Sequence, residues 1–114
     1  LTHGNIINIA SMFSFFGSPM SPGYTASKTG LVGLTKSLAN GWSEHHVRVN
    51  AIAPGAILEP PNVEWTSEQK NNIINAVPMK RMGTEKDIVD AAMYLSEAEY
   101  VTGQILNIDG GKSL

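Results

Sequence analysis

Three side chains between Ser11 and Lys28 are of the types that can move a proton together. Tyr24 and Lys28 are four residues apart, so on a helix they lie on one face, one above the other. Ser11 comes just after an apolar run that is typical of a buried strand. The three side chains are therefore candidates for one acid/base site.

The chemistry explains why these residue types are needed. A free phenol loses its proton only near pH ~10, and a neighbouring cation favours its ionised form. Lys28 could supply that cation to Tyr24. A serine hydroxyl in the same pocket could hydrogen-bond a substrate oxygen and hold it against the tyrosine. Ser11, Tyr24 and Lys28 would then interconvert a carbonyl and an alcohol.

The segments on either side of this stretch predict a strand and a helix. The run from Ile6 to Ala10 predicts a strand of a parallel sheet that is covered on both faces. Ser21 and Pro22 suit the start of a helix, which we expect to reach about Trp42. Its apolar stripe is predicted to consist of Leu31, Leu34 and Leu38.

The rest of the chain repeats the alternation of strand and helix. A second buried strand covers residues 47–52 and is ended by Pro54 and Gly55. Capping patterns predict helices after Thr66 and Thr84, and residues 105–108 predict the last strand. This order predicts an α/β fold in which right-handed crossovers join parallel strands.

Four motifs together cover nearly the whole chain: N-I-A-S at Asn8 to Ser11, Y-T-A-S-K at Tyr24 to Lys28, R-V-N-A-I-A-P-G at Arg48 to Gly55, and Y-V-T-G-Q-I-L-N-I-D-G-G at Tyr100 to Gly111. In these motifs and in their order the sequence resembles the short-chain dehydrogenase/reductase family.

The resemblance implies an enzyme that uses NAD or NADP, with catalytic residues Ser11, Tyr24 and Lys28. Tyr24 would be the general acid or base, Lys28 would tune it and hold the nicotinamide ribose, and Ser11 would orient the substrate. The cofactor-binding residues implied are Tyr24, Lys28, Pro54, Gly55 and Ile57. Glu59 stands where the family usually has a threonine, and a carboxylate there is an unfavourable neighbour for a pyrophosphate.

The resemblance also implies that residues 1–114 are the C-terminal half of one doubly wound, Rossmann-like domain. The glycine-rich turn of such a domain and the residue that selects NAD or NADP would lie upstream of Leu1, as would the family's catalytic asparagine. We therefore expect the 114-residue chain alone to be inactive. The rival hypothesis is an incomplete fragment that acts only as a structural or interaction module.

The motifs are most similar to those of dehydrogenases for sugar acids such as 2-deoxy-gluconate and gluconate. The substrate expected is therefore a sugar acid or a polyol. Two other substrates stay open: a 3-oxoacyl thioester, and a pteridine, because the ending D-G-G-K-S-L resembles that of pteridine reductases.

Composition argues against several other classes of protein. The net charge is −2, with lysine and arginine scattered, so neither a nucleic acid nor a membrane surface is an expected partner. The chain contains no cysteine, and the adjacent His45 and His46 have no suitably spaced third ligand, so no metal site is expected. A cytoplasmic location is the default expectation.

Two further features allow alternative interpretations. Gly30 and Gly33 in the long helix either let it pack closely on the chain's own sheet or belong to a subunit interface, as the resemblance implies for a homodimer or homotetramer. Trp65 either closes over a ligand as part of a lid or packs only on its own loop.

Overall fold

The computed structural model describes residues 3–57 and 64–114. Its sheet contains three parallel strands in the order β1-β2-β3, with β2 in the centre. The strands are β1 (Gly4–Ile9), β2 (Val47–Pro54) and β3 (Ile105–Ile108). This confirms the predicted α/β fold class and the parallel arrangement.

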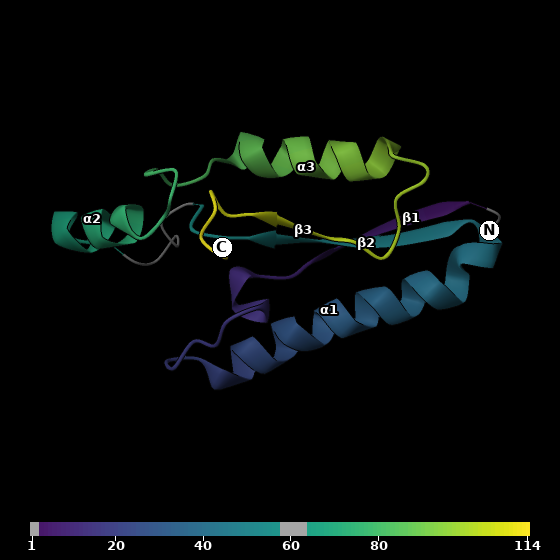
Figure 1. Ribbon diagram of the computed structural model, residues 1–114, viewed down its shortest axis with the longest axis horizontal. Coiled ribbons are helices and arrows are strands. Elements are labelled where there is room, and N and C mark those ends of the chain that lie inside the picture. Colours follow the sequence, from purple (N-terminus) through teal and green to yellow (C-terminus); the bar gives the residue numbers. More distant parts are fainter. Residues whose placement is uncertain (1–2, 58–63) are drawn as a thin grey trace.

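The helices lie on both faces of the sheet and beyond one end of it. Figure 1 shows α1 along one face and α3 along the other, with α2 beyond the end where β2 and β3 finish. Two single-turn 3-10 helices, η1 and η2, were not predicted. The bounds are η1 (Met12–Ser14), α1 (Pro22–Trp42), η2 (Ser43–His45), α2 (Ser67–Asn75) and α3 (Glu85–Glu97).

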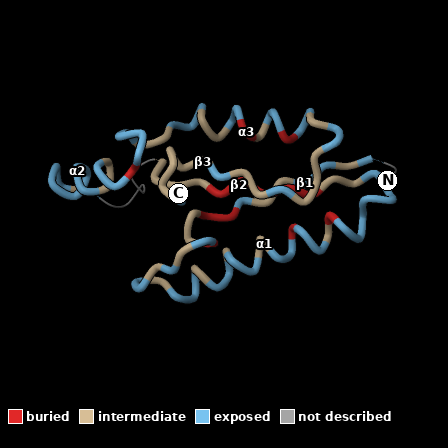
Figure 2. Tube along the Cα trace, viewed as in Figure 1, coloured by how far each residue is buried: buried red, intermediate tan, exposed pale blue. Residues whose placement is uncertain are grey.

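The core consists of two apolar layers that share β2. Figure 2 shows buried residues on this strand and on the helix turns that face it. Ala51 and Ala53 of β2 pack with Leu31 of α1 on one face. On the other face, Ile52 packs with Ala91 and Leu95 of α3. Successive residues of a strand point to opposite faces, so this single strand supplies both layers.

The buried stripe of α1 differs from the predicted leucine stripe. Leu34 is 48% exposed, whereas Thr35 and Ala39 are buried. The Thr35 hydroxyl donates to the Leu31 carbonyl at 2.7 Å and accepts from the Asn8 side-chain amide of β1 at 3.0 Å. The prediction holds for Leu31, which packs on the core, and is wrong for Leu34. Apolar spacing does not show that the small Ala39 and the hydrogen-bonded Thr35 let the helix approach the alanines of the sheet.

Strand β1 is not covered on both faces, contrary to the prediction. Ile6 is 36% and Ile9 is 48% exposed. β1 pairs only with β2, so it forms an edge of the described sheet. Its outer hydrogen-bonding groups and these isoleucines are available to another segment.

The three capped helices begin where the sequence predicts. Thr66 and Gln69 form a reciprocal capping box at α2, and Thr84 and Asp87 form one at α3. Ser21 is the N-cap residue of α1, although its side chain makes no capping hydrogen bond. None of the helices in residues 3–57 and 64–114 is long and apolar enough to cross a membrane.

The R-V-N motif ties β2 to the connection between α3 and β3. The Asn50 side chain is fully buried, donates to the Val101 carbonyl at 3.0 Å and accepts from the Gln104 amide at 3.0 Å. The Arg48 guanidinium donates to the carbonyls of Leu95 at 2.8 Å, Ser96 at 3.0 Å and Val101 at 3.2 Å. The motif thus stabilises the end of α3 and sets the start of β3.

We expect Asn50→Ala to lower the free energy of unfolding by about 2–4 kcal/mol, because it removes the acceptor of the Gln104 amide and one of the two donors to the Val101 carbonyl, and opens a cavity. Urea unfolding of the protein followed by circular dichroism measures this loss. Asn40→Ala is the matched control, because Asn40 is exposed on α1, and it should change stability by no more than about 0.5 kcal/mol. Equal stabilities of the two variants would contradict the role of Asn50.

Candidate active site

The predicted site residues lie at the edge of the sheet where the parallel strands end. Ser11 follows β1, Pro54 and Gly55 end β2, and Asp109 follows β3. In Figure 1 the start of α1, η1 and the C-terminus all lie at this edge. Ligands of open α/β sheets bind at the carboxyl ends of the strands, so this is the expected place for a site.

Ser11 is held in position by the short helix η1. The residue is 6% exposed, and its hydroxyl oxygen accepts from the Phe13 amide at 3.2 Å. The Ser11 amide donates to the Ser14 hydroxyl at 3.3 Å, which in turn donates to the Lys28 carbonyl at 2.8 Å. The Ser11 O–H makes no hydrogen bond to another residue in the described part of the chain, so it can donate to a ligand.

Tyr24 and Lys28 meet at the start of α1, as their spacing predicts. The Lys28 ammonium lies 5.6 Å from the centre of the Tyr24 ring and donates to the Ile9 carbonyl at 2.9 Å. Tyr24 is 47% exposed, which leaves its hydroxyl accessible. The hydrogen bond to Ile9 holds the Lys28 ammonium at the end of β1, two residues before Ser11. It thereby ties the start of α1, which carries Tyr24 and Lys28, to the strand that leads to Ser11.

Glycines brace the loop that leaves β2. The Gly55 amide donates to the Ile108 carbonyl at 2.9 Å, and a Cβ at Gly55 would lie 2.7 Å from the Asp109 Cβ. The Gly83 amide donates to the Ala56 carbonyl at 2.9 Å, and a Cβ at Gly83 would lie 2.6 Å from the Ile57 Cδ1. The contact at Gly55 requires glycine, because the Asp109 Cα also lies only 2.9 Å from that Cβ position, whereas the flexible end of Ile57 could move away from a side chain at position 83. The two backbone hydrogen bonds fix the course of residues 54–57.

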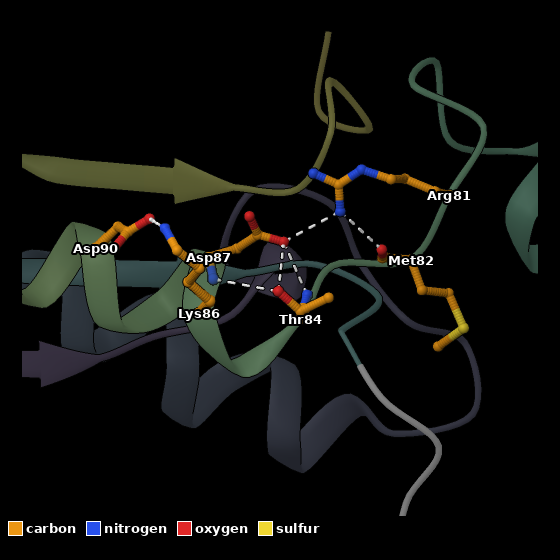
Figure 3. Close-up of polar contacts among 6 residues, drawn as sticks. All are labelled: Arg81, Met82, Thr84, Lys86, Asp87 and Asp90. Carbon is orange, nitrogen blue, oxygen red and sulfur yellow. Dashed lines mark hydrogen bonds and ion pairs between the residues drawn. The ribbon is translucent and has the colours of Figure 1, made fainter.

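Ala56 and Ile57 line a cavity of about 420 Å³ together with the loops before α3 and after β3. Figure 3 shows the charged group beside it, in which the Arg81 guanidinium donates to the Asp87 carboxylate at 3.1 Å. This hydrogen bond and one of 2.8 Å from the Thr84 amide lower the pKa of Asp87 to about 2. Asp87 is therefore ionised at neutral pH, and Arg81 balances its charge next to the cavity.

Comparison with known proteins decides the family. A family model described as enoyl-(acyl carrier protein) reductase, of the short-chain dehydrogenase type, matches residues 2–113. The chain is a member of the short-chain dehydrogenase/reductase family. The resemblance found in the four sequence motifs is thereby confirmed.

The curated relatives are more than twice as long as the 114-residue chain. A 2-dehydro-3-deoxy-D-gluconate 5-dehydrogenase of Bacillus subtilis is 45% identical over 113 residues, which are 96% of this chain and 44% of the relative. A 3-oxoacyl-[acyl-carrier-protein] reductase of Thermotoga maritima is 34% identical over 111 residues, or 96% of this chain and 45% of the relative. The chain thus spans about half the length of the curated relatives it matches.

Solved structures confirm the Rossmann-like architecture. A proposed 2-deoxy-D-gluconate 3-dehydrogenase of Agrobacterium tumefaciens with bound NADP is 45% identical, with a TM-score of 0.89 over 96% of this chain and 46% of that one. A short-chain dehydrogenase of Leptospira borgpetersenii with bound NAD+ is 34% identical, with a TM-score of 0.85 over 96% of this chain and 44% of that one. The fold of this family member therefore matches the corresponding part of these two structures.

Sequence reasoning missed several residues that support the site. Ser14 bridges Ser11 and Lys28, and its position three residues after Ser11 was the available signal, because that is the spacing of a reciprocal cap. Asp109 braces Gly55, and only its place after a strand pointed to it. Phe13 was not missed: the sequence allows it to line a substrate pocket or to pack in the core, and its ring meets that of Tyr24 edge to face, with centres 6.3 Å apart.

Other predicted features lie away from the site or outside the described residues. His45 and His46 are exposed, and no group of three or more metal-ligating side chains occurs in residues 3–57 and 64–114. Trp65 is half-buried before α2, and its lid role stays a prediction. Glu59, Pro60 and Pro61 lie outside the described residues.

Proposed function

We propose that this chain supplies the substrate side of an NAD- or NADP-dependent oxidoreductase that interconverts a carbonyl and a secondary alcohol. The observation that carries the proposal is the position of Lys28, whose ammonium is 2.9 Å from the Ile9 carbonyl and 5.6 Å from the Tyr24 ring centre. A cation fixed beside an accessible phenol is the arrangement that proton transfer from tyrosine requires.

In the reducing direction, the Tyr24 hydroxyl gives its proton to the oxygen of the substrate carbonyl. The Lys28 ammonium stabilises the phenolate that remains. The Ser11 O–H donates a hydrogen bond to the same substrate oxygen and orients it. In the oxidising direction the Tyr24 phenolate takes the proton back. A nicotinamide, when bound, supplies or accepts the hydride.

The loop after β2 fits such a cofactor. The Ile57 amide and carbonyl make no backbone hydrogen bond to another described residue, so both are available to a carboxamide. Pro54 and Gly55 direct the loop there, and Tyr24 and Lys28 would face the nicotinamide ribose. Relatives of known structure hold NADP or NAD+, so either cofactor is compatible with the proposal.

The substrate we propose is a sugar acid or a polyol. Identity of 45% to a 2-dehydro-3-deoxy-D-gluconate 5-dehydrogenase supports this choice, while 34% identity to a 3-oxoacyl reductase keeps the thioester as the main alternative.

The test is a spectrophotometric assay of the protein at its natural length, because the 114-residue chain alone is expected to be inactive. The assay uses NAD and NADP with sugar acids, polyols, a 3-oxoacyl thioester and a pteridine. We expect turnover of a sugar acid or polyol and a lower rate with the other two classes. Turnover of thioesters alone would contradict the substrate proposal. Absence of both turnover and dinucleotide binding would favour the non-catalytic interaction module.

We also propose that residues 1–114 are the C-terminal half of a longer domain. The open outer edge of β1, with Ile6 and Ile9 exposed, supports a further parallel strand beside it. Gly30 and Gly33 support assembly into a homodimer or homotetramer, because a Cβ at either position would meet nothing within 4 Å. The alternative interpretation, in which these glycines let the helix pack closely on the chain's own sheet, is therefore wrong.

Two mass measurements on the protein from its natural source test this pair of proposals. The denatured intact mass is expected to be roughly twice that of the 114-residue chain, in line with its 44% coverage of the Bacillus subtilis relative. Light scattering under native conditions is expected to give two or four chains per particle. A denatured mass equal to that of 114 residues would overturn the half-domain proposal. The cytoplasmic location stays a prediction.

A further inference from the structure

The turn after β3 directs a lysine toward the candidate active site. The Asp109 carboxylate accepts from the Gly111 amide at 3.0 Å and from the Ser113 amide at 3.2 Å. The Lys112 amide donates to the Asp109 carbonyl at 3.1 Å. Gly110 and Gly111 have φ values of 60° and 93°, a conformation that glycine adopts readily. The turn is thus fixed by its own hydrogen bonds, and it fixes the backbone of Lys112.

The Lys112 ammonium is connected to Tyr24 by a row of aromatic rings. Its Nζ lies 5.8 Å from the centre of the Phe16 ring. Phe16 meets Phe13 edge to face with centres 5.6 Å apart, and Phe13 meets Tyr24 in the same way at 6.3 Å. Lys112 and the proposed proton donor therefore contact the same aromatic cluster, through Phe16 and Phe13 respectively.

Within the part of the chain that the structure describes, the charge of Lys112 is not balanced. Lys112 is half-buried, and no carboxylate of residues 3–57 and 64–114 lies within 4.0 Å of its ammonium. Lys86, in contrast, contacts Asp90 at 2.6 Å. The nearby Asp109 carboxylate is instead used by two backbone amides. A partly desolvated cation without a carboxylate partner among the described residues favours an anionic ligand.

We propose that Lys112 is a specificity-determining residue that binds the carboxylate of the substrate. This inference rests on the function proposed above and narrows its substrate class to a polyhydroxy acid. The carboxylate would contact the Lys112 ammonium and the reacting carbon would face the Tyr24 hydroxyl, with the carbon chain beside Phe13 and Phe16. A neutral polyol would leave Lys112 without a partner.

The test uses the protein at its natural length and compares two ligands that differ only in the carboxylate: D-gluconate, and D-glucitol, which has a hydroxymethyl group in its place. Calorimetry with the protein in complex with its oxidised dinucleotide measures Kd for each. We expect Lys112→Met to raise the Kd of gluconate about 10- to 100-fold, the value of a charge-assisted hydrogen bond, and to leave that of glucitol unchanged. Lys112→Arg should retain gluconate binding because it keeps the charge.

Lys36→Met is the matched control, since Lys36 is exposed on α1, and it should change neither Kd. Equal weakening of both ligands by Lys112→Met would mean that Lys112 only supports the structure and would overturn the inference. Unchanged gluconate binding in Lys112→Met, or no gluconate binding by the wild type, would overturn it too. Lys112-dependent binding of gluconate without any hydride transfer would instead overturn the proposed function.

Discussion

Tyr24→Phe is expected to lower kcat by about 100- to 10,000-fold, the contribution of a positioned general acid or base. The substitution removes only the hydroxyl, so the ring keeps its contacts with Phe13 and with the Lys28 ammonium. Dinucleotide affinity should therefore change far less than kcat. The measurement is steady-state kinetics with the substrate found in the assay, together with the Kd of the dinucleotide by fluorescence.

Tyr94→Phe is the matched control for this loss. Tyr94 is 55% exposed on α3, on the sheet face opposite α1 (Figure 1), and its hydroxyl has no proposed role. Its kcat should equal that of the wild type. If Tyr24→Phe retained the wild-type kcat, another group would be the proton donor and the proposed mechanism would be wrong. If Tyr24→Phe lowered dinucleotide affinity by as large a factor as it lowered kcat, the Tyr24 hydroxyl would act in cofactor binding instead.

Much of this arrangement could be predicted from the sequence because the signals are local. The i,i+4 spacing of Tyr24 and Lys28 fixes their common face in any helix. The threonine caps at Thr66 and Thr84 act within three residues of sequence. Strands that alternate with helices allow few arrangements other than parallel strands with crossovers. Such features need no knowledge of distant contacts.

The features that were missed depend on contacts between distant parts of the chain. Leu34 looked like a core residue by spacing, but the depth at which α1 packs is set by Ala51 and Ala53 across the interface. The exposure of Ile9 depends on which strands lie beside β1. The Phe16–Lys112 contact joins residues at opposite ends of the chain. Periodicity carries no information about such pairs.

Gly55 is a residue whose role became clear only from such a distant contact. The sequence predicted that it lets a cofactor approach the backbone, whereas the structure shows that it lets Asp109 approach: a Cβ at position 55 would lie 2.7 Å from the Asp109 Cβ and 2.9 Å from its Cα. A backbone atom cannot move aside as a flexible side chain can. The end of β2 and the turn that carries Lys112 are therefore in direct contact through this glycine.

We therefore expect Gly55→Ala to lower the free energy of unfolding by about 1–3 kcal/mol, the usual cost of overpacking, and to weaken dinucleotide binding, because residues 55–57 must shift. Chemical unfolding and dinucleotide titration of the same preparation measure both effects. Gly41→Ala is the matched control: a Cβ there meets nothing within 4 Å, and alanine in α1 should raise stability by up to about 1 kcal/mol. A Gly55→Ala protein with wild-type stability and affinity would show that the β2 loop does not depend on Asp109. Loss of affinity without loss of stability would instead mean that the added methyl group meets the cofactor, as the sequence alone suggested.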